Sequence, residues 1–205
     1  MINIASFIND LPDWILKEKK IPWEIINNLD SILSGLIESL DQNYTINNGV
    51  AIHKTAVIEQ NVVLKEKIVI SENCFVAANT YLRGPVFMGN SVKIGPGSEI
   101  KQSIILDSTS VAHFNYIGNS FLGKNINLEA GSICANHYNE KENKNISVLY
   151  KEKIIDTKLT KFGSLLIGDS SRIGANAVLS PGTILEKRSI VKRLELIEQL
   201  RNFEV

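Results

Sequence analysis

The residues best suited to chemistry in this chain are a histidine and the cations and amides around it in the sequence. An imidazole exchanges its proton near neutral pH, and arginine and lysine side chains bind anions. The candidates are His113, Arg83, Lys101, Tyr116, Asn127, Asn136, Lys141 and Lys144. Brought together, they would suit an anionic small molecule that must lose a proton when it reacts. A solvated surface of mixed charge is the alternative, and the residue types alone leave both open.

A repeat of six residues is the element that must position these side chains. Apolar residues recur at this spacing at Ile52, Ile58, Leu64, Ile70, Val76, Leu82, Met88, Ile94, Ile100, Leu106 and Ala112. A second set of inward candidates follows four residues later at Ala56, Val62, Ile68, Cys74, Thr80, Val86, Val92, Ser98, Ile104, Ser110 and Tyr116. A strict period of six is typical of a mostly β fold, the hexapeptide parallel β-helix. Three hexapeptides form one coil of about 18 residues, so we expect Arg83 and Lys101 to stack.

The repeat slips at residues 117–121, a unit of five, and then resumes at Leu122. It is interrupted over about residues 137–166 and returns from Ile167 to Leu185, which gives roughly six coils in all. His113 and His53 each follow an apolar corner residue, so both are expected to face outward. Only His113 has candidate partners nearby.

Two flanking regions and one insertion depart from the repeat. Residues 1–46 carry apolar stripes at helical spacing and are predicted to form helices that cover an open end of the coils or pack beside them. The β-helix domain is assigned to residues 47–189, and residues 190–205 are predicted to form a short C-terminal helix. The inserted loop contains two β-like runs, at residues 146–150 and 153–156.

Composition limits the function classes. The net charge is +0, with 22 basic and 22 acidic residues, which gives no electrostatic argument for nucleic acid. The sequence has no apolar run of membrane-spanning length and no signal-peptide pattern at its start, so a cytoplasmic protein is expected. Cys74 and Cys134 fall on inward positions and are predicted to be buried, and neither a disulfide framework nor a bound metal is expected.

Two stretches carry a resemblance to a known family. They are residues 113–120 (HFNYIGNS) and residues 125–136 (NINLEAGSICAN), and their spacing H-x-x-Y-x-G and A-G-x-I-x-A-N is highly specific. Further matching segments are residues 81–86, 99–105, 156–163, 167–169 and 181–184. Over about residues 50–187 the chain resembles the acetyltransferase domain of the bifunctional enzymes that acetylate glucosamine-1-phosphate and then make UDP-N-acetylglucosamine. Their archaeal members are the most similar.

The resemblance implies a left-handed β-helix that works as a homotrimer, with sites between subunits and acetyl-CoA as co-substrate. His113 matches the general base, Glu99 an acidic residue near it, and Asn136 a residue near the thioester. The matches to groups that bind the sugar phosphate or the sugar are Arg83, Lys101, Tyr116, Asn127, Lys141 and Lys144. Backbone atoms at Ala130 and Ala175 match contacts with acetyl-CoA.

Three departures from the family pattern stand out. No nucleotidyltransferase domain precedes the repeat, so we expect the chain not to make the UDP-sugar itself, and a separate nucleotidyltransferase is a candidate partner. Glu129 stands where the family usually has glycine, beside Ala130, and Asn119 replaces the usual aspartate.

The expected function is therefore N-acetylation of an amino-sugar 1-phosphate. Two alternatives stay open: an acyltransferase with another acceptor, and a sugar-phosphate-binding or scaffold relative without catalysis.

Overall fold

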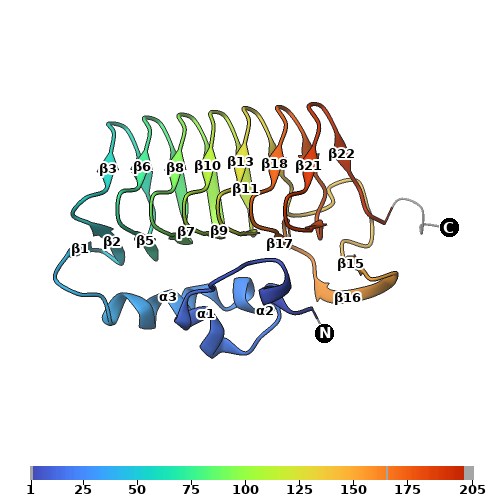
Figure 1. Cartoon of the computed structure of the whole chain (residues 1–205), viewed down its shortest axis with the longest axis horizontal. Coiled ribbons are helices and arrows are strands. Elements are labelled where there is room, and N and C mark those ends of the chain that lie inside the picture. The colour runs from blue at the N-terminus through green and yellow to red at the C-terminus, as the bar shows by residue number, and fades with distance from the viewer. Residues whose placement is uncertain (1, 165, 201–205) are drawn as a thin grey trace.

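The computed structural model describes residues 2–164 and 166–200 and contains a left-handed parallel β-helix, the fold predicted from the hexapeptides. In Figure 1 the coils stand in a row, with helices along one side and a β-hairpin near the C-terminal end. Each coil contributes short strands to three faces. Parallel pairing between successive coils joins these strands into two sheets, because β7 and β9 each run through two faces.

The three faces are named here by what marks them. The seven-stranded face consists of β3 (Val57–Ile58), β6 (Phe75–Val76), β8 (Lys93–Ile94), β10 (Ser110–Val111), β13 (Asn127–Leu128), β18 (Arg172–Ile173) and β21 (Ile190–Val191). The helix-covered face consists of β2 (Val50–His53), β5 (Ile68–Ile70), the second halves of β7 (Tyr81–Met88) and β9 (Glu99–Ile105), β12 (Phe121–Leu122), β17 (Leu166–Ile167) and β20 (Ile184–Leu185). The third face consists of β4 (Val63–Leu64), the first halves of β7 and β9, β11 (Tyr116–Gly118), β14 (Ile133–Cys134), β19 (Val178–Leu179) and β22 (Leu196–Ile197).

The core is a stack of equivalent side chains from successive coils. Leu82 pairs with Ile100, Ile100 with Ile117, and Ile117 with Cys134, and all four side chains are buried. Since each coil places the same position above its predecessor, one apolar residue per hexapeptide is enough to build a continuous interior. Cys74 is buried in the same core, so the prediction for both cysteines is confirmed.

The inward register differs from the predicted one after Ile100. Met88 pairs with Ile105, only 17 residues later, because the ladder between β7 and β9 is irregular between Arg83 and Val86. A first slip therefore precedes the predicted one at residues 117–121, and Val111 rather than Ala112 is the buried residue that follows. The apolar run at residues 104–106 hid this slip, because it satisfies either register.

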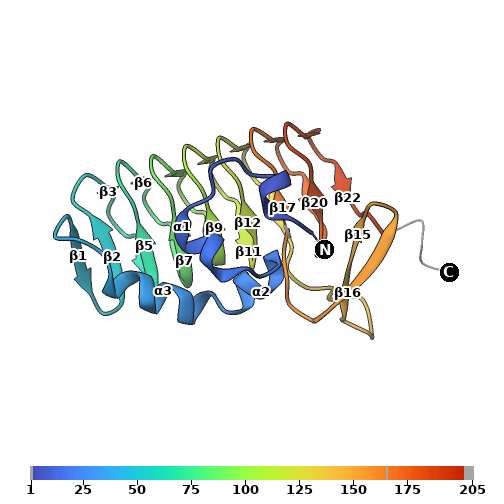
Figure 2. The ribbon, with the colours of Figure 1, turned by 60° about the horizontal axis from the view of Figure 1, so that its bottom comes forward.

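The N-terminal helices pack beside the coils, which settles the alternative left open by the sequence. They are a 3₁₀ turn (Ile4–Ser6), α1 (Asp13–Glu18), α2 (Pro22–Asn27) and α3 (Leu29–Glu38), and Figure 2 shows them along the helix-covered face. Their buried side chains form one apolar cluster with Val69, Phe87, Ile104 and Leu106 of the coils. Ile104 and Leu106 thus face the helices, while Ile105 between them faces the interior of the β-helix. At the other side of β2, the edge of the first coil is paired with the antiparallel strand β1 (Tyr44–Asn47).

The inserted loop forms an antiparallel hairpin of β15 (Ile146–Tyr150) and β16 (Lys153–Leu159). The two β-like runs predicted there are confirmed. Within the described residues, no helix is both long and apolar enough to span a bilayer.

The predicted C-terminal helix is wrong as far as residue 200, because β21 and β22 lie there instead. β21 extends the seven-stranded face and β22 extends the third face, beyond the roughly six coils expected. Val191 pairs with Ile173, and the spacing of six from Leu185 to Val191 continues the coils. Ile190, Leu194 and Ile197 also recur at helical spacing, which is why the stretch resembled a helix. The preceding coil offers backbone partners at once, whereas a short isolated helix is marginal. The rest of the predicted helix, residues 201–205, lies outside the described residues.

Candidate functional site

Charged side chains lie next to one another on the third face, where β7 and β9 pair. Arg83 pairs with Lys101 across the strands, as their spacing predicts. The Arg83 Nη1 atom lies 2.7 Å from Glu99 Oε1, and its guanidinium lies 5.8 Å from the centre of the Tyr81 ring. The hydrogen bond to Glu99 raises the pKa of Arg83. Arg83 is therefore a fixed cation, held between a carboxylate and an aromatic ring.

A third cation, Lys161, adds its positive charge to those of Arg83 and Lys101. Burial, together with the positive charges of Arg83 and Lys161, lowers the pKa of Lys101. We call Arg83, Lys101 and Lys161 the cation cluster. Cations placed this close repel one another, and an anion between them removes the repulsion. The cluster is thus suited to bind a phosphate, for which arginine and lysine are the usual protein partners.

The chain segment after the hairpin brings Lys161 to this face. Phe162 N donates to Asn136 O at 2.7 Å, and Gly163 N donates to Asn119 O at 3.0 Å. A Cβ atom on Gly163 would lie 1.8 Å from Gly118 O, so only glycine permits this approach. The segment is therefore docked on the coil by its backbone, which brings Lys161 near enough for its charge to lower the pKa of Lys101.

Tyr116 and two asparagines form a hydrogen-bonded group beside the cation cluster. Asn136 Nδ2 donates to Asn119 Oδ1 at 2.6 Å, and the Asn136 side chain also bonds to Tyr116. Burial raises the pKa of Tyr116, and the Glu99 carboxylate acts in the same direction. The phenol therefore keeps its proton at neutral pH and can donate to an anion. Gly118 leaves room for the Tyr116 hydroxyl, since a Cβ atom on Gly118 would lie 2.6 Å from Tyr116 Oη.

His113 lies at the corner between the seven-stranded face and the third face. Successive coils place Ala130, Ala175 and Arg193 at the same corner position, and we call these four residues the corner column. Three hydrogen bonds fix the stacking: Gly131 N to His113 O at 3.0 Å, Asn176 N to Ala130 O at 2.9 Å, and Leu194 N to Ala175 O at 2.9 Å. The His113 imidazole is exposed, and its centre lies 5.6 Å from that of the Phe114 ring. The histidine is therefore open to a ligand that runs along the column.

Glu129 closes part of this column. Its Oε2 atom accepts a hydrogen bond from Ala175 N at 2.9 Å and one from Arg193 Nε at 2.8 Å, and its Oε1 atom accepts one from Arg193 Nη2 at 2.8 Å. The hydrogen bonds from Arg193 and from the Ala175 amide lower the pKa of Glu129 below the ordinary 4.5. We call this arrangement the Glu129–Arg193 clasp.

Three predicted site residues lie apart from the cation cluster. Asn127 is exposed on the seven-stranded face, where it pairs with Ser110 and Arg172. Lys141 precedes the hairpin, with its Nζ atom 3.9 Å from the centre of the Tyr138 ring. Lys144 lies in the same loop, two residues before β15. The roles of these three residues stay predictions. The same holds for Glu99 beside His113, because the carboxylate bonds to Arg83 here.

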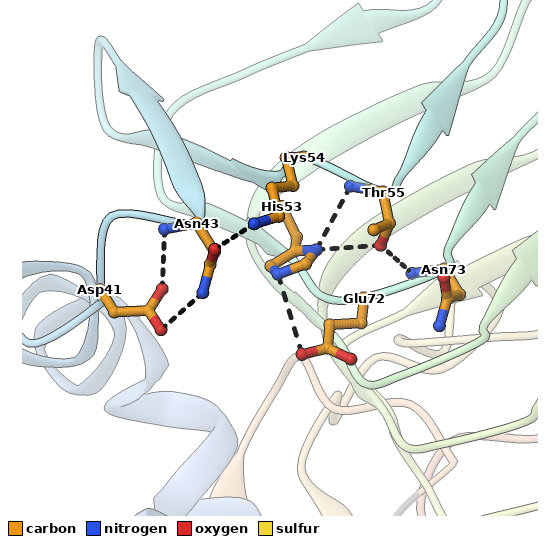
Figure 3. A network of polar contacts seen from close by, with 7 residues as sticks. All are labelled: Asp41, Asn43, His53, Lys54, Thr55, Glu72 and Asn73. Atoms are coloured by element: carbon orange, nitrogen blue, oxygen red, sulfur yellow. Dashed lines mark hydrogen bonds and ion pairs between the residues drawn. The ribbon is translucent and has the colours of Figure 1, made fainter.

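His53, expected to face outward, is instead buried. Figure 3 shows its ring between Thr55 and Glu72, and the ring also packs edge-on against Tyr44, with centres 5.0 Å apart. Thr55 N donates to His53 Nδ1 at 3.3 Å, and the Thr55 hydroxyl lies 2.9 Å from that atom. The accepting Nδ1 leaves the ring proton on Nε2, which lies 3.8 Å from Glu72 Oε1. The prediction failed because β1 covers the first coil, which later coils do not share.

Sequence reasoning missed Lys161 and Arg193. Lys161 lies 60 residues after Lys101, beyond an insertion whose path the repeat does not predict. Arg193 belongs to the coil that was predicted to be a helix. The spacing of 18 between Ala175 and Arg193 was the available signal, because it equals one coil.

Comparison with known proteins gives a consistent set of relatives. Residues 165–192 match a family model described as the hexapeptide repeat of succinyl-transferase. Over 174 residues, 83% of this chain, it is 41% identical to the bifunctional protein GlmU of Methanococcus maripaludis strain C7 and 37% identical to that of strain C5. It is 35% identical over 91 residues, 44% of this chain, to the bifunctional sugar-1-phosphate nucleotidylyltransferase/acetyltransferase of Sulfurisphaera tokodaii. The matched parts are 41% of each GlmU protein and 22% of the third relative, so the chain spans less than half of their length.

Proposed function

Because the chain belongs to the hexapeptide-repeat acyltransferase family, as a relative of the GlmU proteins, we propose that it transfers an acetyl group from acetyl-CoA to the amine of an amino-sugar 1-phosphate. The observation that carries the proposal is the cation cluster beside Tyr116, on the coils that also carry His113. Glucosamine-1-phosphate is the first acceptor to consider, from the resemblance.

The acceptor phosphate is assigned to the cation cluster. Arg83 is oriented by Glu99 and Lys101 is partly buried, so both offer their charge without a large loss of side-chain freedom. Tyr116 adds a protonated hydroxyl from the neighbouring strand. An uncharged sugar would leave these cations repelling one another, and the site should therefore prefer the phosphorylated form.

His113 is assigned as the general base. The amine nitrogen attacks the thioester carbon, a C–N bond forms, and the C–S bond breaks. His113 takes the proton that the amine loses and can return it to the departing CoA sulfur, so that the thiol leaves neutral. The exposed imidazole at the corner supports this role, because both substrates can reach it.

Acetyl-CoA supplies the acetyl group, and the corner column is assigned to it. Ala130 and Ala175 have small side chains, and the outward N–H of Ala175 is a donor suited to a carbonyl or amide of the bound donor. In this structure that N–H bonds to Glu129, so the column fits the donor only when the clasp has opened.

The test is a thiol-release assay with acetyl-CoA. Glucosamine-1-phosphate, galactosamine-1-phosphate and the unphosphorylated amino sugars are compared as acceptors. We expect release that depends on a phosphorylated amino sugar. Release with hydroxyl acceptors only would point to a different acyltransferase, and no release with any acceptor would refute the proposed activity.

The second candidate is a sugar-phosphate-binding relative without catalysis. The Glu129 carboxylate on the Ala175 amide favours it, because the assigned donor column is filled by the chain itself. Calorimetry with glucosamine-1-phosphate distinguishes the candidates: binding of the sugar phosphate without thiol release supports the second.

Assembly belongs to the same proposal. The resemblance favours a homotrimer, and large exposed apolar side chains beside the corner column, Phe114 and Leu194, support a subunit contact there. A separate nucleotidyltransferase as a partner and a cytoplasmic location stay predictions.

A further inference from the structure

The Glu129–Arg193 clasp joins two residues that are 64 positions apart and spans the corner column. Glu129 precedes Ala130, and Arg193 lies in the last described coil, so the ion pair crosses the intermediate coil at Ala175. The clasp is therefore positioned where the proposed acyl donor would run from His113 along the column.

In the clasp, the Glu129 carboxylate accepts hydrogen bonds from N–H groups that point outward from the coils. The Ala175 N–H is the backbone donor of its coil at this corner, and Arg193 offers two parallel N–H groups. The carboxylate accepts from all three at once. A ligand with a carbonyl and an anionic group could satisfy the same donors, so Glu129 acts as an internal competitor.

The surroundings favour an anionic ligand. A hollow of about 560 Å³ borders the clasp on the seven-stranded face, between β13, β18 and β21. Among the residues that line it, the cations are Arg172, Lys192 and Arg193, and Glu129 is the one carboxylate. When Glu129 leaves, all the charged residues that remain in the lining are cations, which suits phosphate groups.

Opening the clasp is energetically accessible. The side chains of Glu129 and Arg193 are 36% and 72% exposed, and water replaces part of what they lose on separation. Exposed ion pairs contribute little to stability, so a ligand that makes equivalent bonds can replace the carboxylate at a cost of about tenfold in affinity or less.

We propose that the Glu129–Arg193 clasp sets the affinity for the acyl donor, with its two residues acting in opposite directions. Glu129 competes with the donor for the Ala175 N–H and for Arg193. Arg193 binds the phosphate groups of the donor once Glu129 has left. The inference rests on the proposed use of a CoA thioester and adds a pair of residues that determines donor specificity.

The test is calorimetry with CoA, which carries the arm and the phosphates but cannot react. Glu129→Ala should bind CoA about five- to tenfold more tightly, because it frees the Ala175 N–H and unmasks Arg193. Arg193→Ala should bind CoA more weakly by a similar factor, because the carboxylate stays near the column without its cation. A pair that only stabilises the fold would shift both variants in the same direction, together with their melting temperatures.

Two CoA fragments separate the contributions. Pantetheine, which lacks the phosphates, should gain affinity in Glu129→Ala. Adenosine 3′,5′-bisphosphate, which lacks the arm, should lose affinity in Arg193→Ala. Glu18→Ala is the matched control, because it removes the carboxylate of another surface ion pair. That pair joins Glu18 to Lys20 in the N-terminal helical region, away from the corner column. This variant should leave all three affinities unchanged.

The possible outcomes distinguish this inference from the proposed function. Opposite shifts support the inference, as does CoA binding to Glu129→Ala when the unaltered protein binds none. Equal affinities, or shifts in one direction, overturn it, while acceptor-dependent thiol release would still support the proposed activity. If no variant binds CoA and no thiol is released, both are overturned.

Discussion

Each cation of the cluster should contribute to recognition of the acceptor phosphate. We predict that Lys161→Ala, like Arg83→Ala or Lys101→Ala, raises KM for the phosphorylated acceptor by about tenfold or more, because a charge-assisted bond is lost. The unphosphorylated sugar should respond much less. Lys158→Ala on the hairpin is the matched control, since Lys158 is also exposed but belongs to β16. Equal losses with both sugars would contradict the assignment of the phosphate.

His113 should contribute to turnover and not to stability. His113→Ala is expected to lower kcat about 100- to 10,000-fold, the usual range for removal of a general base. Its melting temperature should stay unchanged, because the imidazole is exposed. Acceptor-dependent thiol release measures the first effect and thermal unfolding the second. Turnover close to that of the unaltered protein would rule out His113 as the base.

The two thiols give a pH dependence with a definite sign. Burial raises the pKa of Cys74 and of Cys134 from 9.0 to about 11. Below pH 9 both the folded and the unfolded chain keep these protons, so the thiols leave the free energy of unfolding independent of pH. Between about pH 9 and 11 the unfolded chain loses protons that the folded chain retains, and the free energy of unfolding falls.

Urea unfolding at pH 8 and pH 10 measures this effect. The unaltered protein should lose more stability between the two pH values than the double variant Cys74→Ala/Cys134→Ala. Identical losses would mean that the thiols ionise equally in both states. Thiol reagents should label the folded protein slowly at pH 8, because both side chains are buried and protonated.

At the scale of elements, strand β11 makes room for the side chains of Tyr116 and Asn136, because its last residue is Gly118. We predict that Gly118→Ala raises KM for the acceptor, because the new Cβ would lie 2.6 Å from Tyr116 Oη and 2.9 Å from Asn136 Cγ. Both side chains would have to move. The control is Gly35→Ala in α3, where a Cβ would meet no atom within 4 Å. Unchanged kinetics in Gly118→Ala would show that the group of Tyr116 and Asn136 is not needed in its present geometry.

The order of elements also explains why one insertion supplies a site residue. The hairpin of β15 and β16 leaves the coil after Asn136 and returns at Phe162, which bonds to the backbone of Asn136. The insertion thus starts and ends at one place on the third face. Because of this closed path, the charge of Lys161 acts on Lys101, although the two residues lie far apart in the sequence.

At the scale of the whole molecule, we predict a trimer. Phe114 and Leu194 are 70% and 79% exposed, and both stand next to the corner column. Sedimentation equilibrium should give about three times the 22.8 kDa of one chain. The double variant Phe114→Asp/Leu194→Asp should shift the mass toward one chain, because a subunit contact would then bury charge.

Leu16→Asp is the control for this experiment, since Leu16 is 52% exposed but lies on α1, one of the N-terminal helices. It should leave the mass unchanged. A single-chain mass for the unaltered protein would contradict the trimer. An unchanged mass in the double variant would place the subunit contact on another surface.

The sequence by itself determined the coils and the main stacking within them. Leu82 and Ile100 could be assigned to the core, and Arg83 could be placed beside Lys101, because a stacked coil repeats one local geometry. It also indicated the two strands of the insertion. Each of these features depends on residues that are close in sequence or one coil apart.

Only the tertiary structure decided the features that depend on distant partners. The slip before Ile105 was hidden by three consecutive apolar residues, two of which turned out to face the helices. Strand β21 formed instead of a helix because the coil before it supplies hydrogen-bond partners. Lys161 and the Glu129–Arg193 clasp arise where chain segments meet after a long detour or across coils. A periodic pattern specifies which residues face inward, but contacts between separate segments are set by packing, and packing is not periodic.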